Sequence, residues 1–301
     1  LIKSPFLLKK KLTFMRLSNH QKGLLLAFAG VMLLTPDSLI IRLVTLDTWS
    51  LLFYRSLIPG IFLFFCIAIY ARKNFIKFFF NAGKMGFLNS IFIICGNIFF
   101  ILALENTYVA NALVMVSLVP LLSAVIAYIF LREELDRATY AAIFLCLAAV
   151  VFIFYDSIGT GRILGDIFGI LTALAVASSL VVIRAAGAQK NFVPSYVMGK
   201  IFTALIASTL LTSFAISSLD LSYIFLMIFT VAVSFIFIMF APRFISAPEV
   251  GLFFLLETAL GPIWVWWVIK EIPSHNTIVG AAFIIFIIFI HSFYMLKKSN
   301  D

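Results

Sequence analysis

Long apolar runs separated by short polar clusters follow one another along this chain. Each run has roughly 17 to 24 residues, and a helix of that length crosses a hydrocarbon core about 30 Å thick. A transmembrane barrel would instead show alternating segments of about ten residues. The pattern predicts an all-α integral membrane protein with ten transmembrane helices. The runs are at about 23–44, 48–70, 83–104, 107–130, 137–155, 165–188, 194–213, 222–242, 247–269 and 275–296.

Composition supports this fold class. The 301 residues are 63% hydrophobic and 12% charged, whereas soluble domains are about half apolar and a quarter charged. The formal net charge of +9 could suggest nucleic acid, but the cations are confined to clusters between apolar runs, so no nucleic-acid partner is expected. Cys66, Cys95 and Cys146 all lie within apolar runs and are expected to be buried small hydrophobes, not ligands or disulfides.

The Lys and Arg residues predict which side of the membrane each loop faces. With the N-terminus inside, the cytoplasmic segments hold the six cations of residues 1–22 and most later ones, while Arg42, Arg162 and Lys270 stay outside. The positive-inside rule therefore places both termini in the cytoplasm. The later cytoplasmic cations are Arg72, Lys73, Lys77, Lys84, Arg132, Arg137, Arg184, Lys190, Arg243, Lys297 and Lys298.

Two segments of the chain are built alike and indicate an internal repeat. Ala110–Glu133 and Pro248–Glu271 each contain an apolar run, a helix-breaking Pro or Gly-Pro, aromatics and a closing acid. Because each half has an odd number of helices, the two halves are predicted to be inverted-topology five-helix repeats, with a site near the midplane. The aligned pairs are Asn111 with Glu249, Val119 with Glu257, Glu133 with Glu271, Gly23 with Gly165 and Arg55 with Lys200.

This repeat gives the expected domain boundaries. The prediction is a basic cytoplasmic leader at 1–22, a first five-helix repeat at 23–155, a linker at 156–164, a second five-helix repeat at 165–296 and a cytoplasmic tail at 297–301.

Two opposite charges are expected at similar depth. Asp37 in the first run and Arg55 in the second both come to roughly 10 Å from the outer ends of their helices. An unpaired charge at the membrane centre costs about 2.5–3.5 kcal/mol on the lowest scale, so both should face the bundle interior. A structural ion pair and a contribution to substrate binding both remain open.

Glu257 is the sharpest candidate for a functional residue. It lies about ten residues into its helix, too deep for its short side chain to reach water outside the protein. Gly261 and Trp264 follow at i+4 and i+7 on the same helical face, and this stripe could bind a cationic or zwitterionic molecule. The alternatives are a protonated Glu hydrogen-bonded in the core, or a packing face.

Several other polar residues each have two alternative roles. Asn97 and Asn111 can join helices through hydrogen bonds or contact a ligand, and Tyr54 can close a pocket or sit in the aromatic belt. Arg42 and Arg184 lie near helix ends, where their long side chains are expected to snorkel to the interface. For Lys200, six residues into its helix, snorkelling is favoured over a role in the site. The histidines show no HExxH spacing and no G-x-x-x-x-G-K-[ST] motif occurs, so neither a metal nor a cofactor is expected.

The repeated stretches resemble a known family. ALENTYVANALVMVSLVPLLSAVIAYIFLREEL, APEVGLFFLLETALGPIWVWWVIKE and Arg55 in the triplet Phe53-Tyr54-Arg55 are similar to the EamA family of the drug/metabolite transporter superfamily. The resemblance covers residues 20–296 and implies a ten-helix carrier of small metabolites in a bacterial inner membrane. Members often have Pro after the acid that matches Glu257, whereas Thr258 stands here.

The sequence thus favours a secondary transporter that works by alternating access. The expected substrate is a small amino-acid-like, amine or other zwitterionic or cationic metabolite, and proton coupling through Glu257 is an open question. Substrate-binding candidates are Asp37, Tyr54, Arg55, Asn97, Asn111, Glu257 and Trp264. The alternative is a membrane scaffold or sensor without flux, and no catalytic set indicates an enzyme. Expected partners are the metabolite and the lipid bilayer, with a homodimer left open.

Overall fold

The computed structural model describes residues 18–107, 109–154, 163–187, 189–270 and 275–298, and the regular structure in these ranges is entirely helical. Seven helical stretches among them are long and apolar enough to cross a membrane, and three shorter apolar helices accompany these. The helices are α2 (Asn19–Leu34), α3 (Asp37–Leu43), α4 (Thr48–Ala71), η2 (Arg72–Asn74), α5 (Phe75–Phe79), α6 (Gly83–Asn106), α7 (Val109–Val116), α8 (Val119–Leu131), α9 (Arg137–Phe154), α10 (Ile163–Ala186), α11 (Val193–Ser208), α12 (Ser218–Met227), η4 (Ile228–Val233), α13 (Ser234–Phe240), η5 (Ala241–Arg243), α14 (Ala247–Ile269) and α15 (His275–Lys298).

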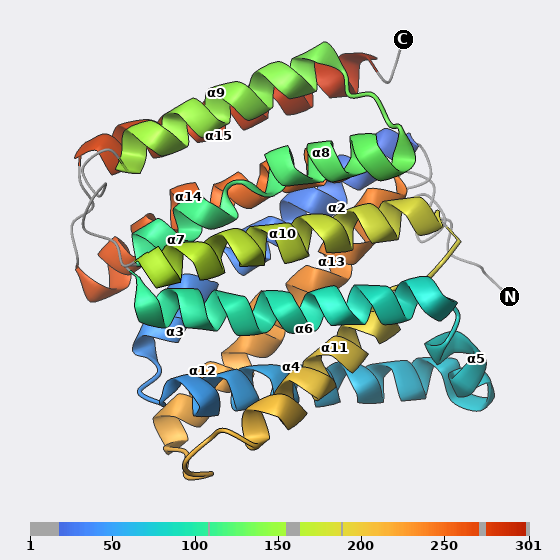
Figure 1. Ribbon diagram of the computed structural model, residues 1–301, viewed down its shortest axis with the longest axis vertical. Coiled ribbons are helices and arrows are strands. Elements are labelled where there is room, and N and C mark those ends of the chain that lie inside the picture. The colour runs from blue at the N-terminus through green and yellow to red at the C-terminus, as the bar shows by residue number, and fades with distance from the viewer. Residues whose placement is uncertain (1–17, 108, 155–162, 188, 271–274, 299–301) are drawn as a thin grey trace, which may run out of the picture.

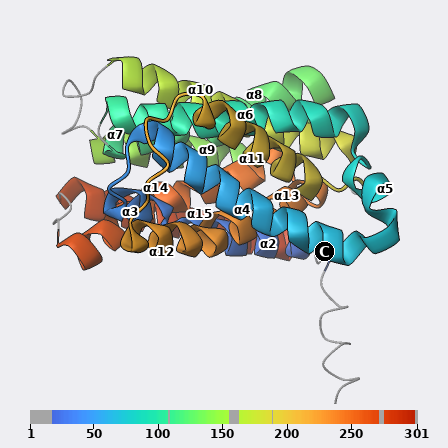
Figure 2. The same ribbon diagram turned by 90° about the horizontal axis from the view of Figure 1, so that it is seen from below.

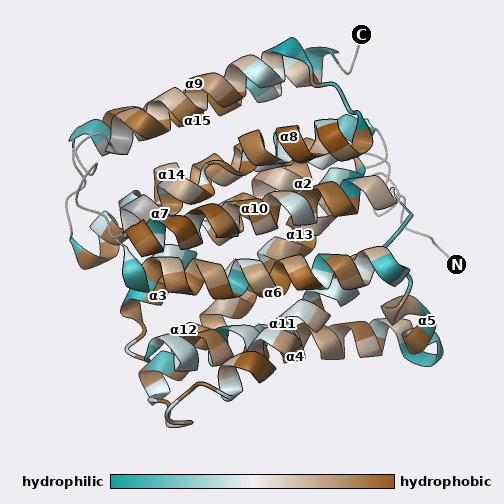
Figure 3. Ribbon diagram, in the orientation of Figure 1, coloured by the Kyte–Doolittle hydropathy of each residue, from teal (hydrophilic) through white to brown (hydrophobic). Residues whose placement is uncertain are grey.

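The long helices run side by side as a bundle (Figure 1). α10 packs against α6 and α8, α4 packs against α11, and α14 lies among α2, α8 and α15. α9 and α15 pack against each other at one edge of the bundle (Figure 1), and the view from below shows α5 at one end of the bundle and α3 toward the other (Figure 2). Hydrophilic residues gather mainly at the two ends of the helices (Figure 3), as expected when the middle of each helix faces other helices or lipid. We call these the α5 end and the α3 end.

Three of the predicted continuous helices are interrupted. The run 23–44 breaks between α2 and α3, because Pro36 offers no N–H and the Thr35 hydroxyl donates to the Met32 carbonyl. The run 107–130 breaks between α7 and α8, just before Pro120, which occupies the first turn of α8. The run 222–242 contains the π-helical turn η4. Apolar periodicity does not report such breaks, which depend on local hydrogen bonds.

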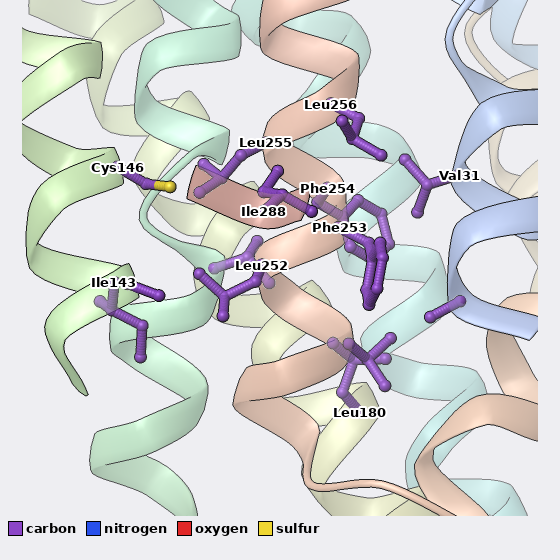
Figure 4. Packing of buried hydrophobic residues seen from close by; sticks show 14 of the residues in the cluster. Val31, Ile143, Cys146, Leu180, Leu252, Phe253, Phe254, Leu255, Leu256 and Ile288 are labelled. Atoms are coloured by element: carbon purple, nitrogen blue, oxygen red, sulfur yellow. The ribbon is translucent and has the colours of Figure 1, made fainter. Parts of the chain in front are cut away.

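α14 forms the centre of the largest apolar cluster. Its residues from Ala247 to Thr258 are buried all round, as expected for a helix that is apolar on every face. Leu252 to Leu256 project toward the neighbouring helices on several sides (Figure 4). The helix starts at a capping box, in which Ser246 and Glu249 each bond the other's backbone N–H. Its middle residues are therefore held at fixed positions within the bundle.

The cysteines differ in burial. Cys146 is fully buried in the cluster, as predicted, but Cys66 is exposed on the outer face of α4 and Cys95 is half-buried. The expectation of burial was wrong for Cys66 because an apolar run does not tell which face of a helix meets lipid. All three are free thiols.

A close approach of α14 to α8 gives a stability prediction. A Cβ added at Gly251 would lie 2.8 Å from the Pro120 Cα, and this backbone atom cannot swing aside. Gly251→Ala is expected to lower the free energy of unfolding by about 1–3 kcal/mol. Gly96→Ala is the matched control, since its Cβ would meet Ala175 at an ordinary 3.6 Å, and helix propensity should make it neutral or stabilising. Denaturant unfolding in detergent measures both, and equal effects would contradict the packing.

Candidate functional site

A buried ion pair joins two helices inside the bundle. Asp37 is the first residue of α3, directly after the Pro36 break. Arg55 lies two turns into α4, a helix whose start is fixed by the Asp47 side chain accepting from the Trp49 and Ser50 N–H groups. The Arg55 Nη2 donates to the Asp37 Oδ2 at 2.5 Å, and the two side chains are 5% and 1% exposed. The proximity expected from helix depth is therefore present.

Asn97 of α6 connects this pair to a second cation. Its side-chain Oδ1 accepts from the Arg55 Nη1 at 3.3 Å and from the Lys200 Nζ at 2.6 Å. Its Nδ2 donates to the Ile93 carbonyl at 2.7 Å, which fixes the orientation of the amide. One amide oxygen thus serves an arginine and a lysine from two different helices.

The prediction that Lys200 snorkels to the interface was wrong. Lys200 of α11 is 1% exposed, and its Nζ lies 5.6 Å from the centre of the Tyr196 ring. α11 can press against α4 because Gly60 carries no side chain: a Cβ there would meet the Lys200 Cβ at 3.1 Å. The alignment of Lys200 with Arg55 in the repeat was the signal that pointed to this position.

Asp37, Arg55 and Asn97 border a cavity between the helices, whereas Lys200 does not line it. The space that water can occupy in it is about 80 Å³, enough for several water molecules. Its polar lining comes from six helices, and the remainder is apolar. The polar lining residues are Asp37, Arg55, Asn97, Thr172, Ser179, Tyr196 and Glu257.

Glu257 reaches the cavity from α14 and is only 5% exposed. Within the described part of the chain, no hydrogen bond or ion pair to its carboxyl group is present. A carboxyl group that lines a buried cavity without a protein partner is available to a ligand or a proton. Asp37 differs from Glu257 because it already forms an ion pair with Arg55.

Two predicted site residues do not line the cavity. The Tyr54 hydroxyl donates to the Phe214 carbonyl at 2.6 Å, and the Trp264 Nε1 donates to the Thr35 Oγ1 at 3.0 Å. A Cβ at Gly261 would meet the Ser38 Oγ at 3.1 Å, so this part of the predicted Glu257 stripe packs against α3. This face turns away from the cavity because Gly261 and Trp264, at i+4 and i+7 from Glu257, contact Ser38 and Thr35 instead. The Asn111 side chain lies outside the described residues.

Sequence reasoning missed several polar groups at the cavity. The Ser179 Oγ of α10 donates to the Asn89 Oδ1 at 2.7 Å, and the Asn89 Nδ2 donates to the Ser195 Oγ at 2.8 Å. This chain of hydrogen bonds ties α10, α6 and α11 together. Tyr196 lies one turn before Lys200, a spacing that could have drawn attention to it. Ser179 and Ser195 gave no signal in the sequence, because single serines are common in apolar helices.

Ionic contacts close the α5 end of the bundle. Arg184 was expected to snorkel, but its Nε and Nη2 donate to the Glu133 Oε1 at 2.9 and 2.5 Å, which joins α10 to the loop after α8. Lys298 donates to Asp136 in the same loop. This hydrogen bond is the main reason that the pKa of Asp136 lies below its ordinary value. The Lys298–Asp136 contact therefore stabilises the fold above the ordinary aspartate pKa, and this contribution disappears as the pH falls below it.

The comparisons with known proteins agree with this picture. The model of the EamA-like transporter family matches residues 21–155. This segment of the chain is EamA-like. The family belongs to the drug/metabolite transporter superfamily, so the matched segment is of the membrane-transporter type, and the spans identify a multi-pass membrane protein.

Structural similarity extends beyond the segment that the family model matches. One solved crystal structure is similar to this chain, with a TM-score of 0.74. The match covers 91% of this chain and 98% of that one. At 15% sequence identity this similarity concerns the fold alone. Among curated proteins, the search finds no match.

Proposed function

We propose that this protein is a secondary transporter of small zwitterionic or cationic metabolites, which bind in the central cavity and reach each side of the membrane in turn. The observation that carries the proposal is the convergence of Asp37, Arg55, Asn97 and Glu257, from four helices, on one buried cavity. Charged groups at membrane depth are costly, and they persist where they handle a substrate or an ion. The EamA-like segment supports the same reading.

The proposed substrate contacts follow from the protein partners that each polar side chain has and from its position at the cavity. The Glu257 carboxyl group has no protein partner in the described chain and would receive the amine of a substrate. Arg55 and Asn97 border the same space and would face a substrate carboxylate or hydroxyl. The apolar lining, which includes Phe92, Phe100 and Phe254, would surround an uncharged side chain. Mostly apolar pockets with a few convergent polar groups are typical of small-molecule sites.

The proposed architecture is two inverted five-helix halves with ten crossings. Its support is the repeat in sequence, together with the seven long spans and the three shorter apolar helices. The breaks between α2 and α3 and between α7 and α8 lie inside expected crossings, which is common beside transporter sites. The cation distribution would place both termini, and hence the α5 end, in the cytoplasm of a bacterium.

Transport in proteoliposomes tests the proposal. Purified protein is reconstituted, and uptake of labelled leucine, isopentylamine and a nucleoside is measured with and without a pH gradient. We expect saturable uptake of at least one amine-bearing compound above protein-free liposomes. Flux of none of these compounds, in either direction and with or without the gradient, would favour a scaffold or sensor instead.

A further inference from the structure

At the junction of Arg55, Lys200 and Asn97, two buried basic side chains share one neutral acceptor. Both donate to the same Asn97 Oδ1, at 3.3 and 2.6 Å, and both residues are at least nine-tenths buried. The amide oxygen carries no net charge, so a carboxylate would be a stronger acceptor for these two donors than Asn97 is.

The carboxylates around this junction do not contact Lys200. Asp37 forms an ion pair with Arg55, and no carboxylate lies within 4.0 Å of the Lys200 Nζ among the described residues. Glu257 lines the cavity without an ion pair to either cation. The Lys200 Nζ can donate more than one hydrogen bond, and the structure engages one, through Asn97. The Arg55 Nε is also buried without a hydrogen-bond partner.

The position of Asn97 shows where an anion would enter. Arg55 and Asn97 line the cavity, whereas Lys200 does not; its Nζ donates to the Asn97 Oδ1 and lies beside the Tyr196 ring. Among the described residues, one other hydrogen bond holds the amide, from its Nδ2 to the Ile93 carbonyl. Rotation of this single side chain would free the Lys200 donor for a group in the cavity beside Arg55.

We infer that Arg55 and Lys200 form an anion subsite, and that the Asn97 Oδ1 occupies the place of a substrate carboxylate in the empty transporter. This inference rests on the proposed transport function and narrows its substrate class: a carboxylate is required, and an amine alone does not suffice. With Glu257 facing the same cavity, the site accepts an α-amino acid whose side chain is small and apolar. The two cations come from α4 and α11, which correspond in the sequence repeat, so each half contributes one.

Three probes of nearly equal shape test the subsite by binding. Leucine carries both groups, 4-methylpentanoate carries only the carboxylate, and isopentylamine carries only the amine. We expect purified protein in detergent to bind leucine most tightly, 4-methylpentanoate more weakly and isopentylamine at least about tenfold more weakly than leucine. Isothermal titration gives the dissociation constants. Binding of isopentylamine as tight as that of leucine, or binding of none of the three, would overturn the inference.

Two substitutions separate the subsite from a purely structural role. Lys200→Met should weaken leucine binding at least about tenfold and leave isopentylamine unchanged, and Lys200→Arg should restore part of the loss. Asn97→Ala should strengthen 4-methylpentanoate binding, because the competing oxygen is gone. Lys84→Met, at an exposed lysine at the start of α6, is the control and should change none of these. If Asn97→Ala weakens carboxylate binding while the protein stays folded, the Asn97 Oδ1 does not occupy the position of the substrate carboxylate, and the inference is wrong.

The results also distinguish this inference from the transport proposal. Leucine that binds in the expected order without crossing the proteoliposome membrane would refute transport and leave the subsite standing. Saturable flux of leucine that is unaffected by Lys200→Met would support a carrier and refute the subsite.

Discussion

Replacing Arg55 by methionine is expected to lower the free energy of unfolding by about 3–5 kcal/mol, the largest stability effect that the structure predicts. The substitution leaves Asp37, 1% exposed, as a buried carboxylate that has lost its ion-pair partner. It also removes one of the two donors to the Asn97 Oδ1. Chemical unfolding in detergent provides the measurement.

A double-mutant cycle shows whether the loss comes from the ion pair itself. Asp37→Asn combined with Arg55→Met leaves no uncompensated charge, so the double variant should recover most of the stability that the single variant loses. Arg42→Met, at an exposed arginine five residues after Asp37, is the control and should change stability by less than about 1 kcal/mol. If the two single substitutions add in the double variant, Asp37 and Arg55 do not act as a pair.

Replacing Glu257 by glutamine is expected to abolish transport of an amine-bearing substrate while the fold remains intact. Glutamine keeps the shape but removes the charge, and losing one partner of a buried charge pair costs about 2–5 kcal/mol in binding. This corresponds to an affinity loss of roughly 30-fold to several thousand-fold. Stability should hardly change, because no hydrogen bond or ion pair within the described residues uses the carboxyl group. Initial uptake rates in proteoliposomes measure the loss.

The same variant decides whether Glu257 carries a proton. If it does, uptake by the wild type should depend on the pH gradient, and any residual exchange by Glu257→Gln should not. Transport that survives in Glu257→Gln with unchanged pH dependence would remove the proton role. Trp264→Phe is a useful comparison, because Trp264 donates to Thr35 outside the cavity and its loss should affect stability more than flux.

Periodicity and charge placement predicted much of the helical architecture. The expected runs at 48–70, 83–104 and 247–269 match α4, α6 and α14 closely, because length and apolarity suffice to define a helix that crosses lipid. The breaks at Pro36 and before Pro120 were not predicted as helix ends. Proline in a membrane helix can kink it or end it, and hydrogen bonding by neighbours decides between the two.

The polar centre could be predicted in part. Depth counting brought Asp37 and Arg55 together correctly, because the cost of an isolated charge leaves few alternatives. Lys200 was misjudged because a long side chain six residues from a helix end can reach water in principle, and only the packing of α11 on α4 prevents it. Trp264 shares a helical face with Glu257, but which helix that face meets is a tertiary property.

The most direct test of alternating access is the accessibility of one cavity position from both sides. Cys66, Cys95 and Cys146 are first replaced, and Gly96, which lines the cavity, becomes the single cysteine. A membrane-impermeant maleimide is then applied to right-side-out and to inside-out vesicles. We expect labelling from both sides, slowed by leucine in each case. Labelling from one side only, or from neither, would contradict a carrier with a central site.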